Sequence, residues 1–311
     1  MKIQIKSLNA KVVLPAILAL GSLGAALAAP ITITDALHRT VTVNTPVKRV
    51  VTLSLTAAEI MQDIGLSPVG RPSSATHPAS ILKVPEVGGA YSPDIEKILA
   101  LKPGLLLGST GTTAARARDL GALPVPLIVT PDSSLKDVYD TYTLVGRLTG
   151  QQDSAALALK LLQNKVNRVL AQVPKTGARP KVLALLAAGG QSFSTTADTY
   201  IGDLLEKLGV VNVANGTPSP DPRQPGFVVL SLEQIVASNP DVILAFRPRT
   251  ANGDFSPSPL VTLEGQPAYQ NLAAVKAGRV YLLDADPFVT APGPRAVDAL
   301  KALMPLLYPK R

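Results

Sequence analysis

The sequence predicts an α/β protein made of two similar lobes with mostly parallel sheets, joined by one long helix. Short apolar runs alternate with amphipathic stretches of helical period, which is the pattern of parallel strands connected by helices. Residues 151–173 carry apolar side chains at helical spacing over about six turns, in the middle of the chain. One motif occurs once in each half, which indicates two lobes of the same build: Glu96-x-Ile98-x-Ala100-x-x-Pro103-x-x-x-Leu107 is repeated as Glu233-x-Ile235-x-Ala237-x-x-Pro240-x-x-x-Leu244.

The first predicted elements are a hairpin, a strand and a helix. Residues 31–43 alternate apolar and polar side chains around a polar turn, as hairpins do. The apolar run at 49–53 predicts a short buried strand. Thr56 and Glu59 have the spacing of a capping box, which predicts that a helix begins directly after this strand.

The alternation of helix and strand then continues to the end of the chain. Ser92 and Pro93 predict a helix start, with the serine as N-cap and the proline at the first helical position. Pro103 ends this helix. The remaining elements are strands at 105–107, 125–129, 181–187, 210–212, 242–246 and 280–283, helices at 112–122, 151–173 and 197–208, and a helix that Ser231 and Gln234 cap and Pro240 ends.

The N-terminal segment has the three features of a secretory signal peptide, namely a basic start, an apolar stretch at 12–27 and small residues at 26–29. Cleavage near Ala28 or Ala29 would remove three lysines and no acidic residue, so the net charge would fall from +8 to +5. Because no cysteine stands at the cleavage site, a periplasmic protein without a lipid anchor is expected. The predicted division is a signal peptide (1–29), an N-terminal lobe (30–132), a helical connection that includes the long helix (133–175) and a C-terminal lobe (176–311).

The composition excludes several kinds of chemistry. The 311 residues include no Cys, which excludes disulfides, thiolate metal sites and cysteine nucleophiles, and the two histidines, His38 and His77, are too few for a three-histidine metal site. The glycine-rich motifs for dinucleotides and for P-loop phosphates are missing. The mild charge forms no run of Lys or Arg, so no nucleic-acid partner is expected. The sequence predicts binding rather than catalysis, with no cofactor and no metal held by the protein.

Candidate ligand contacts lie in or beside the loops that follow the predicted strands, where open α/β sheets bind ligands. The chain has only 7 Tyr and 5 Phe, yet several of them fall in or beside these loops together with several arginines. Such groups suit a large, partly planar or anionic ligand. The alternative is that Phe227 and Tyr200 belong to the core of their lobe and that the arginines are solvated loop charges. The candidates are Thr56, Arg71, His77, Tyr91, Phe193, Tyr200, Arg247 and Arg295.

Five stretches of the chain, together with Pro292-Gly-Pro-Arg295, resemble one known family. They are similar, in order and over nearly all of the chain after the signal peptide, to the periplasmic iron-complex and cobalamin binding proteins of ABC importers. The resemblance implies two Rossmann-like lobes bridged by a single long helix, the class III periplasmic-binding-protein fold. Gly104 departs from the family, which usually has Asp there. The stretches are 46–70 (PVKRVVTLSLTAAEIMQDIGLSPVG), 84–108 (VPEVGGAYSPDIEKILALKPGLLLG), 198–214 (DTYIGDLLEKLGVVNVA), 230–245 (LSLEQIVASNPDVILA) and 271–286 (NLAAVKAGRVYLLDAD).

The resemblance also implies a function. Members capture a ferric siderophore, cobalamin or haem between their lobes and deliver it to a membrane permease, without catalysis. Two family glutamates, one per lobe, form salt bridges to arginines of the permease dimer, and by motif position they correspond to Glu96 and Glu233. The protein itself is expected to be a monomer.

The choice of ligand depends on a few side chains. Haem members commonly carry a Tyr or His iron ligand, a role open to Tyr91 and His77, whereas cobalamin members place Trp against the corrin and this chain has no Trp. The loop arginines favour an anionic ferric complex. The expected ligand is therefore a ferric siderophore, with cobalamin second and haem third. A secreted α/β hydrolase that uses His77 is the alternative from another class.

Overall fold

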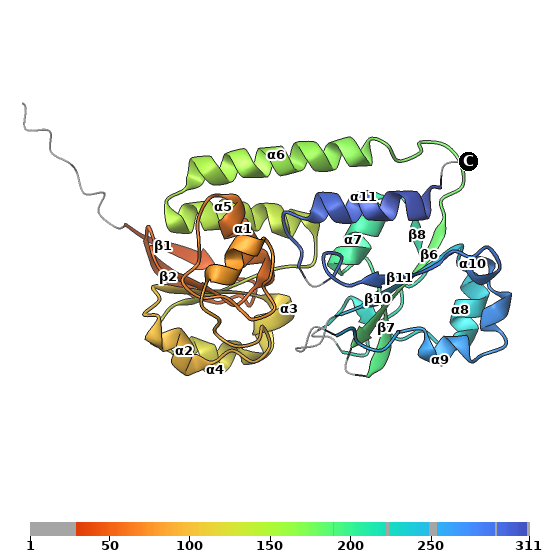
Figure 1. Ribbon diagram of the computed structural model, residues 1–311, viewed down its shortest axis with the longest axis horizontal. Helices are drawn as coiled ribbons and strands as arrows, with labels where there is room; N and C mark the ends of the chain where they lie inside the picture. The colour runs from red at the N-terminus through yellow and green to blue at the C-terminus, as the bar shows by residue number, and fades with distance from the viewer. Residues whose placement is uncertain (1–28, 189, 222–223, 249–253, 290, 310–311) are drawn as a thin grey trace, which may run out of the picture.

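The computed structural model describes residues 29–188, 190–221, 224–248, 254–289 and 291–309. The predicted signal peptide, apart from Ala29, lies outside these residues. Two α/β halves lie side by side along the long axis of the molecule (Figure 1). Within the described residues, no helix combines the length and the apolar character that a membrane span requires.

The first half contains a hairpin and a small parallel sheet. The hairpin is antiparallel, and the strand order of the parallel sheet is β3-β4-β5. Its strands are β1 (Ala29–Thr34), β2 (Thr40–Thr45), β3 (Val50–Thr52), β4 (Leu105–Ser109) and β5 (Leu127–Thr130). Its helices are α1 (Leu55–Asp63), α2 (Ile95–Ala100), α3 (Thr110–Thr113), α4 (Ala117–Gly121) and α5 (Leu135–Thr149), with 3₁₀ turns at Ala79–Lys83 and Ala114–Arg116.

The second half is built on a six-stranded sheet of order β11-β10-β6-β7-β9, with β8 paired to β6. Strands β6, β8, β10 and β11 are parallel, whereas β7 and β9 are antiparallel to their neighbours. The strands are β6 (Lys181–Ala188), β7 (Gln191–Thr195), β8 (Val211–Asn212), β9 (Phe227–Val228), β10 (Val242–Arg247) and β11 (Val280–Asp284). The helices are α7 (Tyr200–Lys207), α8 (Leu232–Ser238), α9 (Val261–Glu264), α10 (Ala273–Lys276) and α11 (Ala296–Leu307), with a 3₁₀ turn at Tyr269–Asn271. The predicted α/β class with mostly parallel sheets is confirmed.

The long helix predicted at 151–173 is α6 (Gln152–Leu170), which extends along one side of the molecule from the first half towards the second (Figure 1). Gly150 ends α5 in the left-handed conformation (φ 72°), so that the chain reverses directly into α6. A Cβ at Gly146 would lie 2.7 Å from the Cβ of Ala155, so α5 and α6 pack closely. The largest buried cluster joins both halves to α6; its members include Ile60, Tyr142, Val166, Leu244 and Leu300.

Two helices begin elsewhere than the sequence patterns predict. Helix α1 is capped by Ser54, whose hydroxyl accepts a hydrogen bond from the Ala57 amide at 3.3 Å, so the capping box of Thr56 and Glu59 is wrong. Helix α2 is capped by Asp94, which accepts from the Lys97 amide at 3.1 Å, rather than by Ser92. In both places another good N-cap residue lies two positions away, and the local pattern does not decide between them.

The internal repeat corresponds to a repeated unit of structure, α2 followed by β4 and α8 followed by β10. Ile98 and Ile235 are the buried residues of the two helices, 0% and 2% exposed. Lys102 and Asn239, six residues after the glutamates, both adopt positive φ, 46° and 41°. Each helix therefore ends in the same way before a proline and a buried strand.

The departure at Gly104 leaves this unit intact. The Gly104 amide donates to the Arg49 carbonyl at 2.8 Å, and the Asp241 amide donates to the Lys181 carbonyl at the same distance. Asp241 additionally accepts a hydrogen bond from the Lys181 amide with its carboxylate, at 2.8 Å. The second half thus gains one side-chain hydrogen bond, while the backbone connection is the same.

Candidate functional site

The carboxyl ends of the parallel strands of the two halves lie towards the middle of the molecule. Helix α3, which directly follows β4, lies at the inner edge of the first half, on the side of the second half (Figure 1). Ligands of open α/β sheets bind beyond the carboxyl ends of the strands. The candidate site therefore comprises the loops that follow these strands in both halves.

On the first half, Asp132 organises the chain after β4 and β5. Its carboxylate accepts hydrogen bonds from the Thr110 hydroxyl at 2.5 Å and from the Gly111 amide at 3.1 Å. Burial raises the pKa of Asp132, and the hydrogen bond from Thr110 lowers it in part. Tyr91, on a nearby loop of the same half, is 70% exposed and leaves its ring available to a ligand.

On the second half, Arg247 ends β10, and its guanidinium forms no ion pair with any residue that the structure describes. Its Cζ atom lies 4.5 Å from the ring centre of Phe255, and its Nε is buried without a hydrogen-bond partner among the described residues. Asp284 is its neighbour in the register of β10 and β11, but no salt bridge joins the two side chains. A cation held against an aromatic ring can receive an anionic group.

His77 and Phe193 keep part of their surface accessible. His77 is exposed in the loop before the first 3₁₀ turn, and Phe193 is half-buried on β7. With Tyr91 and Arg247, they are the four predicted contacts that a ligand could reach without rearrangement of the core.

Arg71 has a structural role, which corrects its prediction as a ligand contact. The residue is only 3% exposed, and its guanidinium holds the surrounding loop together through hydrogen bonds. It also donates to the Glu86 carboxylate at 2.9 Å. Its other hydrogen bonds, at 3.1–3.2 Å, are donated to the carbonyl oxygens of Pro72, Ser73, Ala75 and Val84.

Arg295 is likewise engaged inside the protein, in an ion network that joins the two halves. Its Nε donates to the Glu59 carboxylate of α1 at 3.0 and 3.1 Å, and its Nη2 does so at 2.5 Å. Its Nη1 and Nη2 donate to Asp286 at 2.8 and 2.6 Å. The side chains of Glu59 and Arg295 are 4% and 14% exposed. The prediction of Arg295 as a ligand contact is therefore corrected to an ion pair between α1 and the start of α11.

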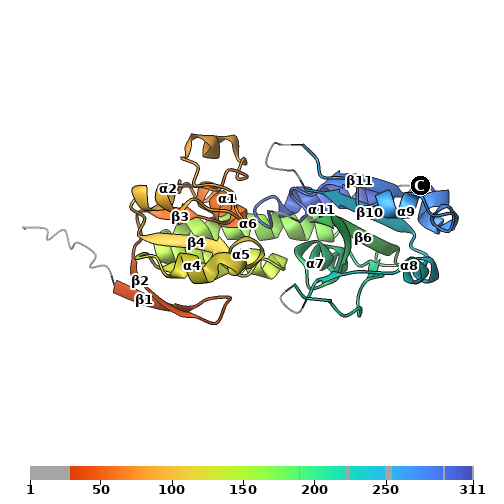
Figure 2. The same cartoon turned by 90° about the horizontal axis from the view of Figure 1, so that it is seen from below.

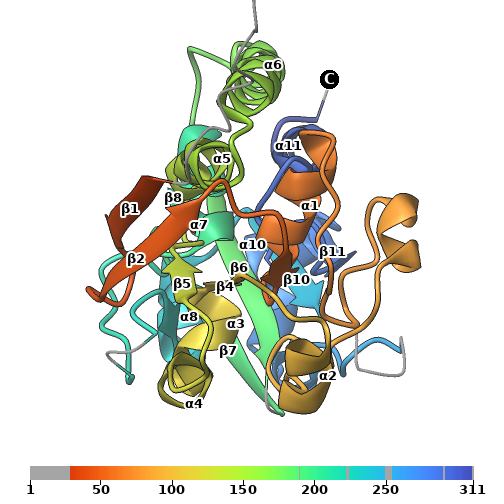
Figure 3. The same ribbon diagram turned by 90° about the vertical axis from the view of Figure 1, so that its left-hand side faces the viewer.

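Residues 291–295, here called the crossing segment, explain why Thr56 is buried. Ala291 is 1% exposed in a cluster with Leu55 and Ala58 of α1, and a Cβ at Gly293 would lie 4.0 Å from Thr56. Figures 1 and 3 show the chain before α11 beside α1. Thr56 is only 3% exposed, so its prediction as a ligand contact is also corrected.

Tyr200 belongs to the core of the second half, as the alternative interpretation of the sequence had it. The residue is 3% exposed in the largest buried cluster, and its hydroxyl is buried as well. Burial raises the pKa of this phenol well above its usual range. A ligand in the candidate site would not reach this side chain.

Glu59 makes the stability of the protein depend on pH. Burial raises the pKa of Glu59 to about 7 from 4.5, although Arg295 lowers it in part. Between these values the folded state holds a proton that the unfolded state has lost. The free energy of unfolding should therefore fall by up to about 3 kcal/mol from this group as the pH rises from 4.5 to 7, and stay level above.

Chemical denaturation of the wild type and of Glu59→Gln over pH 4.5–8 measures this slope. Glutamine does not titrate, so the difference in stability between the two proteins should change with pH in that window only. A difference that stays constant would show that the carboxyl titrates at its ordinary pKa.

Glu96 and Glu233 are the second residues of α2 and α8, and both are exposed. Neither carboxylate forms an ion pair with another residue in the described part of the chain. Glu233 accepts hydrogen bonds from its own amide and from the Ser231 hydroxyl, which lower its pKa and keep it charged. Both helices lie on the side of the molecule away from α6 (Figures 1 and 2).

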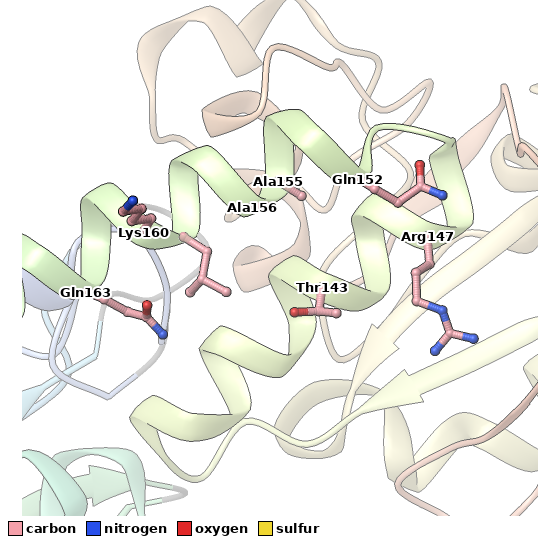
Figure 4. A pocket seen from close by; sticks show the side chains of 8 residues that line it. Thr143, Arg147, Gln152, Ala155, Ala156, Lys160 and Gln163 are labelled. Atoms are coloured by element: carbon pink, nitrogen blue, oxygen red, sulfur yellow. The ribbon is translucent and has the colours of Figure 1, made fainter.

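A groove between α5 and α6 is separate from the candidate site (Figure 4). It has a volume of about 300 Å³, and none of the predicted contacts lines it. Its lining consists of Thr143, Arg147, Gln152, Ala155, Ala156, Leu159, Lys160 and Gln163.

Several residues of the site escaped prediction from the sequence. Asp132 lies two residues after the end of β5, so the rule that favours loops after strands could have found it. Glu59 carries no local signal, because its partner Arg295 lies 236 residues away in the sequence, whereas Asp286 lies nine residues before Arg295.

Comparisons with known proteins agree with the architecture. A family model described as periplasmic binding protein matches residues 50–287. An uncharacterized ABC transporter substrate-binding lipoprotein of Bacillus subtilis is 27% identical over 288 residues, 90% of this chain and 86% of that protein. A cobalamin-binding protein of Halobacterium salinarum is 29% identical over 287 residues, 87% of this chain and 72% of that protein. The crystal structure of an ABC transporter substrate-binding protein from Listeria monocytogenes aligns with a TM-score of 0.71 and 26% identity, over 84% of this chain and 99% of that one.

Proposed function

This chain belongs to the periplasmic binding protein family, and from that membership we propose that it is the solute-binding component of an ABC importer. It captures its ligand between the two halves and delivers it to a membrane permease. The matched relative and solved structure that are named as ABC transporter substrate-binding proteins support this proposal. The chain acts outside the cytoplasm after export, and its described residues provide binding surfaces rather than a catalytic arrangement.

The ligand is an anionic iron complex, most simply a ferric siderophore. The observation that carries this choice is Arg247, a half-buried cation stacked on Phe255 without an ion-pair partner among the described residues. Tyr91, Phe193 and His77 supply aromatic surface on both halves. Cobalamin is the second candidate, because a matched relative carries that ligand in its name. Haem is the third, with Tyr91 or His77 as the group that would approach its iron.

Docking to the permease uses Glu96 and Glu233. Each is an exposed carboxylate at the second position of a short helix, and the two helices occupy equivalent places in the repeated unit of the two halves. A permease dimer with one basic side chain per subunit would contact both at once.

Ligand binding to the purified protein tests this proposal. Ferric siderophores, cobalamin and haemin are added separately, and native mass spectrometry with absorbance spectra records which compound is retained and at what stoichiometry. We expect one ferric siderophore per chain, recovered chemically unchanged. Turnover of the added compound would support the hydrolase alternative, and no retention of any compound would contradict the proposal.

Mass spectrometry of the exported protein checks cleavage near Ala28 or Ala29.

Arg247→Gln is expected to weaken binding of an anionic ferric complex by about tenfold or more, because one charge-assisted hydrogen bond is lost. Isothermal titration measures the change. Arg168→Gln is the matched control, since Arg168 is an exposed arginine on α6, remote from the strand ends. Equal affinities of the Arg247 variant and the wild type would remove Arg247 from the site.

A further inference from the structure

Helices α2 and α8 present the same surface in the two halves of the protein. Leu99 and Val236 follow Glu96 and Glu233 by three residues, and each is followed in turn by an alanine. Leu99 is 38% exposed and Val236 is 40% exposed. Residues three and four positions apart share one face of a helix. Each helix therefore exposes a carboxylate, an aliphatic side chain and a methyl group on one face, and buries only its isoleucine.

An exposed aliphatic residue by itself needs no explanation. Here the exposure recurs at the same position of a repeated unit, beside a carboxylate that has no ion pair within the described residues. The neighbouring cation on α2 is already engaged, because the Lys97 ammonium lies 3.6 Å from the Asp94 carboxylate. The two surfaces are thus alike in charge and in apolar character, although the loops around them differ.

We propose that Leu99 and Val236 are apolar contacts to a partner that is itself two-fold symmetric, and that each packs against the same surface on one of its two copies. That surface consists of a basic side chain, which pairs with Glu96 or Glu233, beside an apolar patch. The inference rests on the proposed function, in which this partner is the permease of an ABC importer. The apolar contacts exclude water from around the ion pairs, as residues at the edge of a binding hot spot do.

The placement of the helices fits such a partner. Both lie on the side away from α6 and towards opposite ends of the molecule, so a single partner would have to contact both halves (Figures 1 and 2). A two-fold symmetric partner presents the same surface twice, so the single chain that binds it must present two matching surfaces. The repeated unit provides these two surfaces.

The test is ligand uptake by cells that lack the chromosomal copy and express a variant in its place. Three probes are used, a radio-iron ferric siderophore, radio-cobalt cobalamin and radio-iron haemin, and the purified variants are checked for ligand affinity and Tm. Leu99→Gln with Val236→Gln should lower uptake about tenfold at unchanged ligand affinity. The exchange Leu99→Val with Val236→Leu should retain uptake, since either aliphatic residue suits either copy of a symmetric partner.

Leu157→Gln with Leu161→Gln is the matched control, because these residues are 61% and 51% exposed on α6 and should not affect uptake. Wild-type uptake by the double glutamine variant would overturn the inference while the proposed function stands. If the glutamine variants do not fold, loss of uptake by the well-folded exchange variant would overturn it instead. Absence of uptake of all three probes with the wild-type chain would reject the proposed function, and the inference with it.

Discussion

Arg295→Met is expected to lower the free energy of unfolding by about 3–5 kcal/mol, the usual cost of removing one partner of a buried ion pair. The variant leaves Glu59, whose side chain is 4% exposed, without its guanidinium partner, and it leaves Asp286 without two hydrogen bonds. Chemical denaturation at pH 8 measures the loss, because wild-type Glu59 is ionised above its pKa of about 7.

A surface ion pair of similar length is the control. Lys136 and Asp140 are separated by 2.5 Å, as Arg295 and Glu59 are, but their side chains are 78% and 57% exposed. Lys136→Ala should change stability by less than about 1 kcal/mol. Glu59→Gln in the Arg295→Met background should recover part of the loss, since glutamine does not leave an unpaired charge. Equal effects of Arg295→Met and Lys136→Ala would show that the buried network contributes little.

This ion network connects elements that the sequence alone does not bring together. The polypeptide passes between the halves through α6, and the crossing segment returns from β11 to pack Ala291 against α1. Arg295 ends this segment and fixes it to Glu59. The two halves are therefore held by a helix and by a second, ionic contact, which restricts how they can move relative to each other.

Local interactions explain what the sequence could predict. The repeated unit is set by residues within twelve positions of one another: a buried isoleucine, a proline that ends the helix and a hydrophobic strand. Its two copies can therefore be recognised from these local residues, without the rest of the chain. The same holds for the capping box of Ser231 and Gln234, which the structure confirms.

Long-range contacts explain which features could not be predicted from the sequence. Thr56 and Glu59 have the spacing of a capping box, but the Ser54 cap places Glu59 inside the helix, where Arg295 reaches it from the other half. Arg71 lies in a loop of the kind that supplies ligand contacts, yet backbone carbonyl groups of its own loop surround it. Whether an arginine binds a ligand or the protein itself depends on burial, which composition and spacing do not determine.

Reversal of both docking charges, Glu96→Lys with Glu233→Lys, is expected to abolish uptake while ligand affinity and Tm stay at wild-type values. Both carboxylates are exposed and form no ion pair within the described residues, so their loss should not disturb the fold. Two lysines would then face the basic side chains of the permease, and like charges in contact cost several kcal/mol in an interface. Uptake of the radiolabelled ligand by complemented cells, together with titration of the purified protein, separates transport from binding.

The matched control is Glu206→Lys with Glu264→Lys, which changes the net charge equally at two other exposed glutamates, on α7 and α9. The control changes the net charge of the protein, and hence its long-range electrostatic field, by the same amount. Normal uptake with the control would therefore assign the loss of uptake to positions 96 and 233 rather than to the net charge. Each single reversal should already reduce uptake strongly, since a symmetric partner engages both halves together. A loss of ligand affinity in the double variant would instead place Glu96 or Glu233 in the ligand site and contradict their assignment to docking.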